Sequence, residues 1–137
     1  MFASHSYAAR AYAKVGVQSG VESSSPHGLI LMLFDGALAS IAQAREAMRR
    51  ERIAERGEAA SRAIEIVQMG LKASLDMSQG GELAQSLADL YDYIARLLLA
   101  GNATANPAKL DEAARLLGEL RGAWARIEVA THSGAQP

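Results

Sequence analysis

The stretch SPHGLILMLFDGAL, residues 25–38, constrains the fold most, because it begins a helix and then places apolar side chains on every side of it. The Ser25 hydroxyl can cap this helix, and Pro26 suits its first position, where no N–H is needed. At about 100° per residue, one face carries the core candidates Ile30, Phe34, Ala37, Ile41, Ala44 and Met48. The opposite side carries Leu29, Met32, Gly36 and Ala39. A helix packed on one neighbour needs only one apolar stripe, so the second side indicates an additional covering partner.

Three further stretches repeat apolar residues at three- and four-residue spacing, which is typical of amphipathic helices. The first carries Ala60, Ile64, Val67, Leu71 and Leu75, and it stops at SQGG, residues 78–81. The second carries Leu83, Leu87, Leu90, Ile94, Leu97 and Leu98. We expect this second helix to end at Gly101, in the left-handed conformation that terminates helices. The third follows Asn106 and Pro107 and carries Leu110, Ala113, Leu117, Leu120, Trp124 and Ile127.

The boundary between the first two helices contains neither glycine nor proline, since residues 49–52 read RRER. An unbroken helix from Pro26 to Leu75 would be about 75 Å long, too long for one small domain to cover, so we place a turn near Glu51–Ile53. Short connections make neighbouring helices antiparallel. The sequence therefore predicts an all-α fold, an antiparallel up-down four-helix bundle over residues 25–130. Outside the bundle we expect a short N-terminal helix or arm and a linker at 1–24, and a disordered tail at 131–137.

The composition argues against some classes of partner and indicates a cellular compartment. Fourteen basic and fifteen acidic residues nearly cancel, which argues against nucleic acid or an anionic membrane surface as a partner. The chain has no cysteine, which favours a reducing compartment, and we expect a cytoplasmic protein. The longest apolar run covers only residues 29–34, against roughly 20 residues for a membrane-spanning helix. We therefore expect no membrane insertion.

The residues that commonly carry chemistry are scattered along the chain. His5, His27 and His132 lie outside the core stripes, so the sequence lacks the Glu-x-x-His pattern of metal-binding bundles. The glycines at 80–81 lack the preceding strand of a phosphate-binding loop. Asp35 is expected to be half-exposed near a helix start, where the macrodipole favours a carboxylate. These observations predict that the protein is not an enzyme and that it needs no metal or other cofactor.

Charged side chains four residues apart predict ion pairs within single helices. The pairs are Glu46 with Arg50, Glu58 with Arg62, Asp92 with Arg96, and Asp111 with Arg115. All of them belong to solvated helix faces, so they give no evidence of a charged binding site.

Apolar residues outside the stripes are the remaining clue to function. Ile66 and Met69 lie about 140–160° from the stripe of their helix, and Tyr91 and Tyr93 flank the leucine stripe of the next one. Methionines and aromatic rings at such edges are common in adaptable binding surfaces, which favours a partner-binding groove. Three other interpretations stay open: isolated exposed apolar residues, a cover formed by the N-terminal segment, and burial in a homodimer.

Several strings resemble those of the flagellin-specific export chaperones of bacterial flagella, the FliS family, in the same order and spacing. They are SPHGLILMLFDGAL at Ser25, GEAASRAIEIV at Gly57, LDMSQGGELAQSLADLYDYIARLLL at Leu75 and LLGELRGAWARI at Leu116. With AYAKVGVQS at Ala11, the resemblance covers nearly the whole chain. This sequence departs from the family pattern at three places: the serine-rich linker 18–24, Gly28 and the alanine-rich turn 101–106.

The resemblance implies a cytoplasmic chaperone that binds the disordered C-terminal segment of flagellin, prevents premature polymerisation and aids type III flagellar secretion. The segment would order as an amphipathic helix in apolar grooves, without ATP or metal. The implied flagellin contacts are Leu29, Met32, Gly36, Ile66, Met69, Tyr91 and Tyr93. Tyr12 and Val15 would act as a detachable cover of the groove or as a contact for the flagellar export gate. The alternative is a self-associating structural or regulatory helical bundle.

Overall fold

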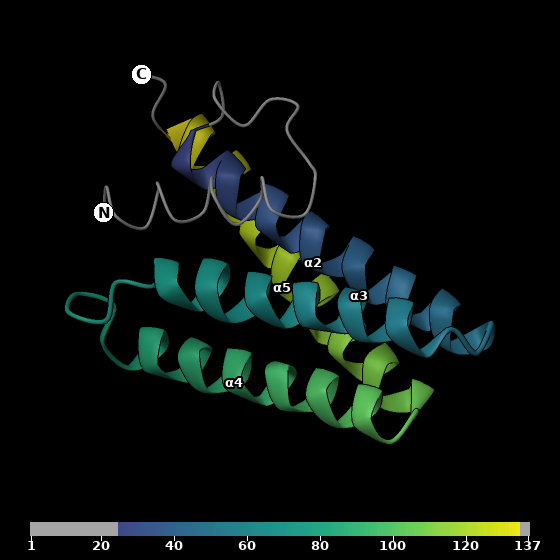
Figure 1. The fold of residues 1–137 in the computed structure, drawn as a ribbon. Helices are drawn as coiled ribbons and strands as arrows, with labels where there is room; N and C mark the ends of the chain where they lie inside the picture. Colours follow the sequence, from purple (N-terminus) through teal and green to yellow (C-terminus); the bar gives the residue numbers. More distant parts are fainter. Residues whose placement is uncertain (1–24, 135–137) are drawn as a thin grey trace.

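The computed structural model describes residues 25–134, with side chains described as far as Ile127. The elements, labelled as in Figure 1, are α2 (Pro26–Arg49), α3 (Ile53–Glu65), the π-helix η1 (Ile66–Leu71), the 3-10 helix η2 (Lys72–Ser74), α4 (Gly81–Ala103) and α5 (Pro107–Gly134). α3, η1 and η2 follow one another without a break. The N-terminal helix or arm that we predict at 1–24 lies outside the described residues.

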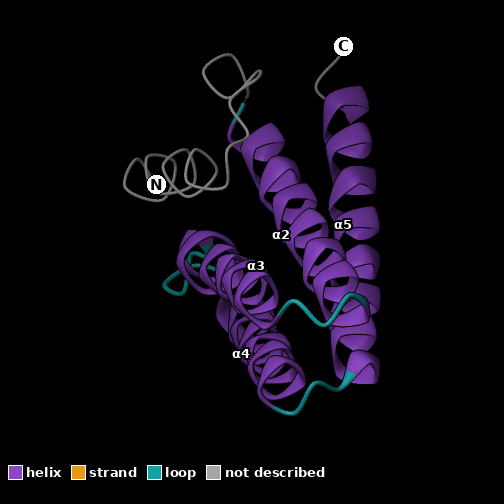
Figure 2. Cartoon of the chain, turned by 45° about the vertical axis from the view of Figure 1, so that its right-hand side comes forward, coloured by secondary structure: helices purple, strands orange, loops and turns teal. Residues whose placement is uncertain are grey.

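The helices form two layers, with α2 beside α5 and the α3–η1 stretch beside α4 (Figures 1 and 2). Consecutive helices contact each other and run antiparallel, which confirms the predicted all-α, up-down four-helix bundle. The two layers cross at an angle rather than running parallel. As a result, the start of α2 and the end of α5 project beyond the layer of α3 and α4 (Figure 1).

α2 begins where the sequence predicts. The Ser25 hydroxyl accepts a hydrogen bond from the Gly28 N–H at 3.1 Å, with Pro26 in the first turn. Of the predicted core face, Phe34, Ala37, Ile41 and Ala44 are buried, and Ile30 and Met48 are partly buried against the core. α2 is long and apolar enough to span a membrane, but buried core helices meet the same two criteria. In this bundle 44% of its most apolar window is buried.

The turn between α2 and α3 occupies residues 50–52, close to the predicted position. The Arg52 N–H donates to the Ala47 carbonyl at 2.8 Å, and the Glu51 N–H donates to the Met48 carbonyl at 3.1 Å. These two bonds form a Schellman motif, in which the residue just past the helix takes a left-handed conformation that glycine usually supplies. Here that residue is Glu51, with a φ of 58°. The turn therefore forms without glycine, at a conformational cost.

Replacing Glu51 with glycine should raise the free energy of unfolding by about 0.5–1 kcal/mol. A non-glycine residue in the left-handed conformation costs roughly 1–2 kcal/mol, and glycine removes this cost. The greater conformational freedom of glycine in the unfolded chain offsets part of the gain. Urea unfolding followed by circular dichroism measures the change. Arg52→Gly is the control, because Arg52 has an ordinary φ of −96°. Equal effects of the two substitutions would show that the turn is not strained.

The prediction that α4 ends at Gly101 is wrong. The helix continues to Ala103, and Ala105 takes the left-handed conformation, with a φ of 50°. Gly101 is buried instead, and a Cβ atom built on it would lie 2.9 Å from Leu110 Cδ2. Its missing side chain thus lets α5 approach α4 closely. The last helix also runs further than expected, to Gly134, whereas we predict the tail to begin at Thr131.

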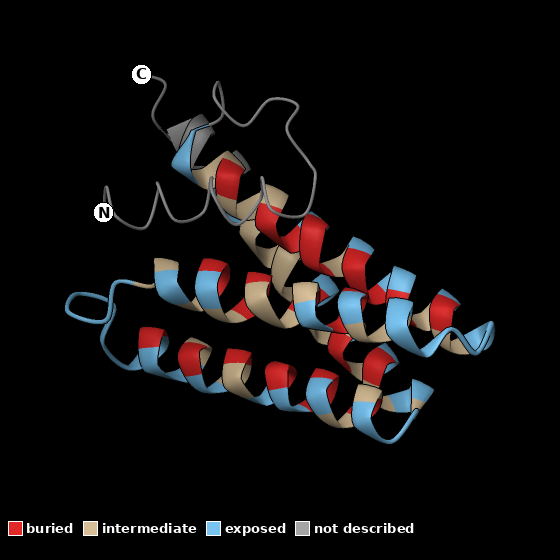
Figure 3. Cartoon of the chain, viewed as in Figure 1, coloured by how far each residue is buried: buried red, intermediate tan, exposed pale blue. Residues whose placement is uncertain are grey.

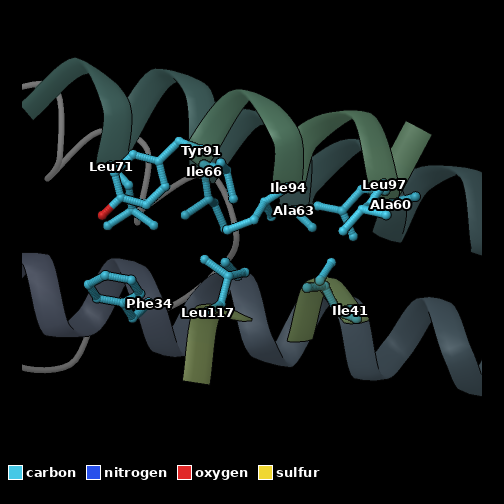
Figure 4. Packing of buried hydrophobic residues seen from close by; sticks show 14 of the residues in the cluster. Phe34, Ile41, Ala60, Ala63, Ile66, Leu71, Tyr91, Ile94, Leu97 and Leu117 are labelled. Atoms are coloured by element: carbon cyan, nitrogen blue, oxygen red, sulfur yellow. The ribbon is translucent and has the colours of Figure 1, made fainter. Parts of the chain in front are cut away.

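The core lies between the two layers. Figure 3 shows buried residues along the sides of the helices that face one another, and Figure 4 shows side chains from both layers meeting there. The largest fully buried side chains are Phe34, Leu29, Leu33, Ile41, Ile66, Leu71, Ile94, Leu98, Leu110, Leu117 and Val67. Because these residues come from α2, η1, α4 and α5, one continuous core holds the bundle together.

Several ion pairs connect different helices. The predicted pair of Glu46 and Arg50 forms within α2 at 2.8 Å. Three other pairs join separate elements: Lys72 with Asp92 at 2.8 Å, Arg45 with Asp111 at 2.7 Å, and Arg121 with Asp35 at 2.6 Å. Asp92 and Asp111 thus pair across helices, where the four-residue rule predicts pairs within one helix. All three pairs are partly exposed, so each helps to align the helices more than it stabilises the fold.

Candidate functional site

The second apolar side of α2 is largely covered by the bundle itself. Leu29 has an exposed fraction of 1% and Gly36 is buried, so the prediction that they lie on an open surface is wrong. The physical reason is that α2 has neighbours on more than one side, since α3, η1 and α5 all pack on it. Met32 is partly buried and packs against the core. Of the three predicted contact residues on α2, Met32 alone stays partly accessible.

The prediction for Ile66 is also wrong, because this residue has an exposed fraction of 0% and belongs to the core. The core face of α3 and η1 includes small residues that the apolar pattern passes over, namely Ala59, Ala63 and Gly70. A Cβ atom on Gly70 would lie 3.1 Å from Leu33 Cδ2, so η1 and α2 are in close contact there. Met69 lies on the outer side of η1 and is 46% exposed.

The two tyrosines of α4 differ in environment. Tyr91 is 5% exposed and its ring lies among the core side chains in Figure 4, so its prediction as a surface residue is wrong. Burial raises the pKa of Tyr91 to about 12. Tyr93 is 39% exposed, and its hydroxyl donates to Glu112 Oε2 at 2.7 Å. This hydrogen bond raises the pKa of Tyr93, because it favours the protonated phenol. Only Tyr93 is available to a partner.

The first half of α4 carries a partly uncovered apolar face that spacing alone does not reveal. We name it the α4 leucine face, and it consists of Leu83, Leu87, Leu90 and Tyr93. The pattern predicts the three leucines as core, yet Leu83 is 70% exposed and the other two are only partly buried. Their spacing of three and four residues places them on one side of the helix. Leu83 is therefore open to solvent, while Leu87 and Leu90 keep one side packed against the core.

α5 leaves this face open because it changes neighbours along its length. Its first turns pack on α4, where Leu110 meets Gly101 and Glu112 meets Tyr93. Its later turns pack on α2, where the Arg121 guanidinium bonds to the Asp35 carboxylate at 2.6 Å. Figures 1 and 2 show α5 following α2 away from the start of α4. The crossing of the two layers thus exposes residues that a parallel bundle would bury.

Trp124 and His27 hold the projecting ends of α5 and α2 together. Their rings are stacked, with centroids 4.5 Å apart and an angle of 16° between the planes. The Trp124 Nε1–H also donates to the His27 carbonyl at 3.2 Å. The His27 ring thus packs on tryptophan rather than facing solvent. Over the described residues, we find no group of three or more histidine, aspartate or glutamate side chains arranged to hold a metal ion.

Two shallow grooves border α3, and in both of them charged side chains alternate with apolar ones. One, of about 290 Å³, lies between α2 and α3 and includes Glu46, Arg50 and Arg62. The other, of about 550 Å³, extends from Ile53 along α3 to Asn102 of α4. The charged side chains of Glu58 and Arg62 border both grooves. The α4 leucine face, with Met69 as a smaller accessible apolar site on η1, is the stronger candidate for binding another chain.

Comparison with known proteins finds similarity over nearly the whole sequence. The family model described as "Flagellar protein FliS" matches residues 8–131. The chain is 45% identical over 118 residues to the flagellar secretion chaperone FliS of Salmonella typhimurium, covering 86% of this chain and 87% of that protein. It is 40% identical over 117 residues to the flagellar secretion chaperone FliSB of Pseudomonas aeruginosa, with coverage of 85% and 92%. The FliS chaperone of Escherichia coli is 38% identical over 121 residues, with coverage of 86% and 89%.

Proposed function

The chain belongs to the FliS family of flagellar secretion chaperones, and on this premise we propose that it binds the C-terminal segment of newly made flagellin. By occupying that segment, the chaperone prevents premature polymerisation and keeps the subunit ready for type III flagellar secretion. The complex forms in the cytoplasm and is passed to a component of the flagellar export gate. The mechanism is binding and release, so it requires no catalysis, nucleotide or metal.

The observation that carries this proposal is the α4 leucine face. Leu83, Leu87 and Leu90 repeat at the spacing by which one amphipathic helix packs on another. Leu83 is 70% exposed, and no helix of the described bundle covers it. A disordered segment with its own apolar stripe gains burial by ordering on such a face, and this gain offsets part of the entropy that ordering costs. The face thus suits a client that is disordered when free and helical when bound.

Three of the contacts expected from the sequence remain in the proposed site. Tyr93 belongs to the α4 leucine face, and Met32 of α2 and Met69 of η1 are further apolar side chains that stay at least partly accessible. Leu29, Gly36, Ile66 and Tyr91 support the site from the core without contacting the client. Tyr12 and Val15 lie outside the described residues, and we retain for them the role of a detachable cover or an export-gate contact.

Calorimetry with two forms of flagellin tests the proposal. Full-length flagellin should bind this chain, and flagellin lacking its C-terminal segment should not. Equal binding of the truncated form would contradict the proposed mechanism. Sedimentation at low micromolar concentration addresses the alternative of a self-associating bundle. A persistent homodimer that does not respond to a flagellin C-terminal peptide would favour that alternative.

Replacing Leu83 with aspartate should weaken flagellin binding by more than about tenfold, or ~1.4 kcal/mol. A carboxylate at this position would have to be desolvated beneath the client helix. Because Leu83 is 70% exposed, the substitution should leave the helical content and melting temperature of the free chaperone nearly unchanged. Calorimetry and circular dichroism measure the two quantities.

Leu99→Asp is the matched control for Leu83→Asp. Leu99 belongs to the same helix and is 62% exposed. It lies about 160° around α4 from Leu83, so it points away from the α4 leucine face. Binding should survive this change. If both aspartate variants weaken binding equally, the client does not dock on the α4 leucine face.

A further inference from the structure

The Tyr93 side chain of α4 is bonded to the first turns of α5. Its hydroxyl donates to Glu112 Oε2 at 2.7 Å, and this hydrogen bond is the main cause of the raised pKa of Tyr93. Among the described residues, Glu112 accepts no other hydrogen bond, because the guanidinium of the neighbouring Arg115 bonds to Glu119 at 3.0 Å. The Glu112 carboxylate is therefore committed to the Tyr93 phenol.

The packing of α5 on α4 does not depend on this hydrogen bond. A Cβ atom built on Gly101 would lie 2.9 Å from Leu110 Cδ2 and 3.2 Å from Lys109 Cβ, so the two helices already meet closely there. Leu110 is fully buried, whereas Tyr93 is 39% exposed. A hydrogen bond at an exposed site replaces one to water and adds little to stability. The bond should therefore affect the Tyr93 ring more than it affects the two helices.

We propose that Glu112 is a positioning residue, which holds the Tyr93 ring in one rotamer at the edge of the α4 leucine face before the client arrives. This inference rests on the proposed function and adds to it a residue that acts through Tyr93. An aromatic side chain on a helix surface otherwise samples more than one staggered χ1 position, and a client that requires one of them binds only that fraction. Fixing the ring in advance lowers the entropy lost on binding.

The hydrogen bond also determines what Tyr93 offers to the client. A phenol has a single O–H donor, and here Glu112 accepts it. Tyr93 therefore presents its ring to the client, rather than a hydrogen-bond donor. The client side chain that lies over Tyr93 is accordingly an apolar one.

Competition between variant and unmodified chaperone for limiting flagellin measures small changes in affinity. Glu112→Ala should weaken binding about twofold to threefold, because the freed ring spreads over two or three χ1 positions. Glu112→Gln should keep the original affinity, since its amide oxygen also accepts the phenol hydrogen bond. Tyr93→Phe keeps the ring but loses the bond, so it should match Glu112→Ala. Combining Tyr93→Phe with Glu112→Ala should cause no further loss.

Two further measurements separate positioning from a structural or general charge effect. NMR couplings of the Tyr93 side chain in the free chaperone should show one χ1 rotamer in the unmodified chain and in Glu112→Gln, and a mixture in Glu112→Ala. The three melting temperatures should be nearly equal. Glu119→Ala is the matched control, because it removes another carboxylate from α5, one that bonds to Arg115 rather than to Tyr93. Its affinity for flagellin should be unchanged.

Several results would overturn the inference. They are unchanged affinity or a single Tyr93 rotamer in Glu112→Ala, equal weakening by Glu112→Gln or by Glu119→Ala, a further loss in the combined variant, and a lowered melting temperature of Glu112→Ala. The rotamer measurement needs no client. If the unmodified chain failed to bind flagellin while the Tyr93 rotamer still depended on Glu112, the proposed function would be wrong and the positioning of Tyr93 would stand.

Discussion

Replacing Ile66 with alanine should lower the free energy of unfolding by about 2–5 kcal/mol, the usual cost of truncating a buried aliphatic side chain. Ile66 has an exposed fraction of 0% and belongs to the continuous core. It lies in η1, which packs against both α2 and α4, so the cavity would open where both layers meet. Urea unfolding of the purified chain measures the change.

Met69→Ala is the control, since Met69 is three residues away in the same π-helix and is 46% exposed. Its free energy of unfolding should change by less than about 1 kcal/mol. This pair of variants also separates structure from function. Ile66→Ala should affect flagellin binding only through the fraction of folded protein, whereas Met69→Ala should weaken binding of the folded chain. Equal stabilities would show that the core face of η1 is not the one described.

Replacing Gly101 with valine should destabilise the bundle by about 1–3 kcal/mol, the range found for overpacked cores. A Cβ atom at this position would lie 2.9 Å from Leu110 Cδ2, 3.2 Å from Lys109 Cβ and 3.3 Å from the Asn106 carbonyl oxygen. The Leu110 side chain can shift, but the backbone oxygen belongs to the turn that begins α5. The substitution should therefore push the start of α5 away from α4. Thermal melting by circular dichroism measures the loss.

Gly57 provides the opposite case on α3. A Cβ atom built there has no neighbour within 4 Å, and the residue lies inside a helix. Gly57→Ala should therefore raise the free energy of unfolding by about 0.5–1 kcal/mol, because alanine loses less conformational freedom in a helix. If Gly101→Val proved as harmless as Gly57→Ala, the close contact between α4 and α5 would be contradicted.

The sequence alone predicted the number, order and direction of the helices, because apolar spacing and chain length depend on local geometry. It also located the α2–α3 turn without a glycine, since a helix from Pro26 to Leu75 would have been too long for the domain. It failed where one helix must be aligned with another. Gly70 and Gly101 carry no apolar side chain, yet both lie where two helices are in close contact. A pattern that counts only large apolar residues leaves these glycines out. It therefore places the core face of the helix at the wrong angle around the helix axis.

The candidate site was harder to predict than the fold for a related reason. Leu83, Leu87 and Leu90 have the spacing of core residues, and only the crossing of the layers explains why α5 leaves Leu83 exposed and the other two partly buried. Conversely, spacing predicts Leu29 and Ile66 to lie off the core, because it takes account of only one neighbouring helix, yet both are buried. The burial of a residue depends on how many helices surround it, and spacing within one helix does not contain that information.

The stacking of Trp124 on His27 determines what fluorescence can report on this protein. Trp124 is the only tryptophan in the chain, and its ring lies at the contact between α5 and α2. Emission will therefore respond when the end of α5 separates from α2, whatever happens to α4. A client bound on the α4 leucine face should leave the spectrum almost unchanged even at saturation. A fluorescence titration without signal is thus compatible with tight binding, and a shifted spectrum would mean that the layer of α2 and α5 has been disturbed.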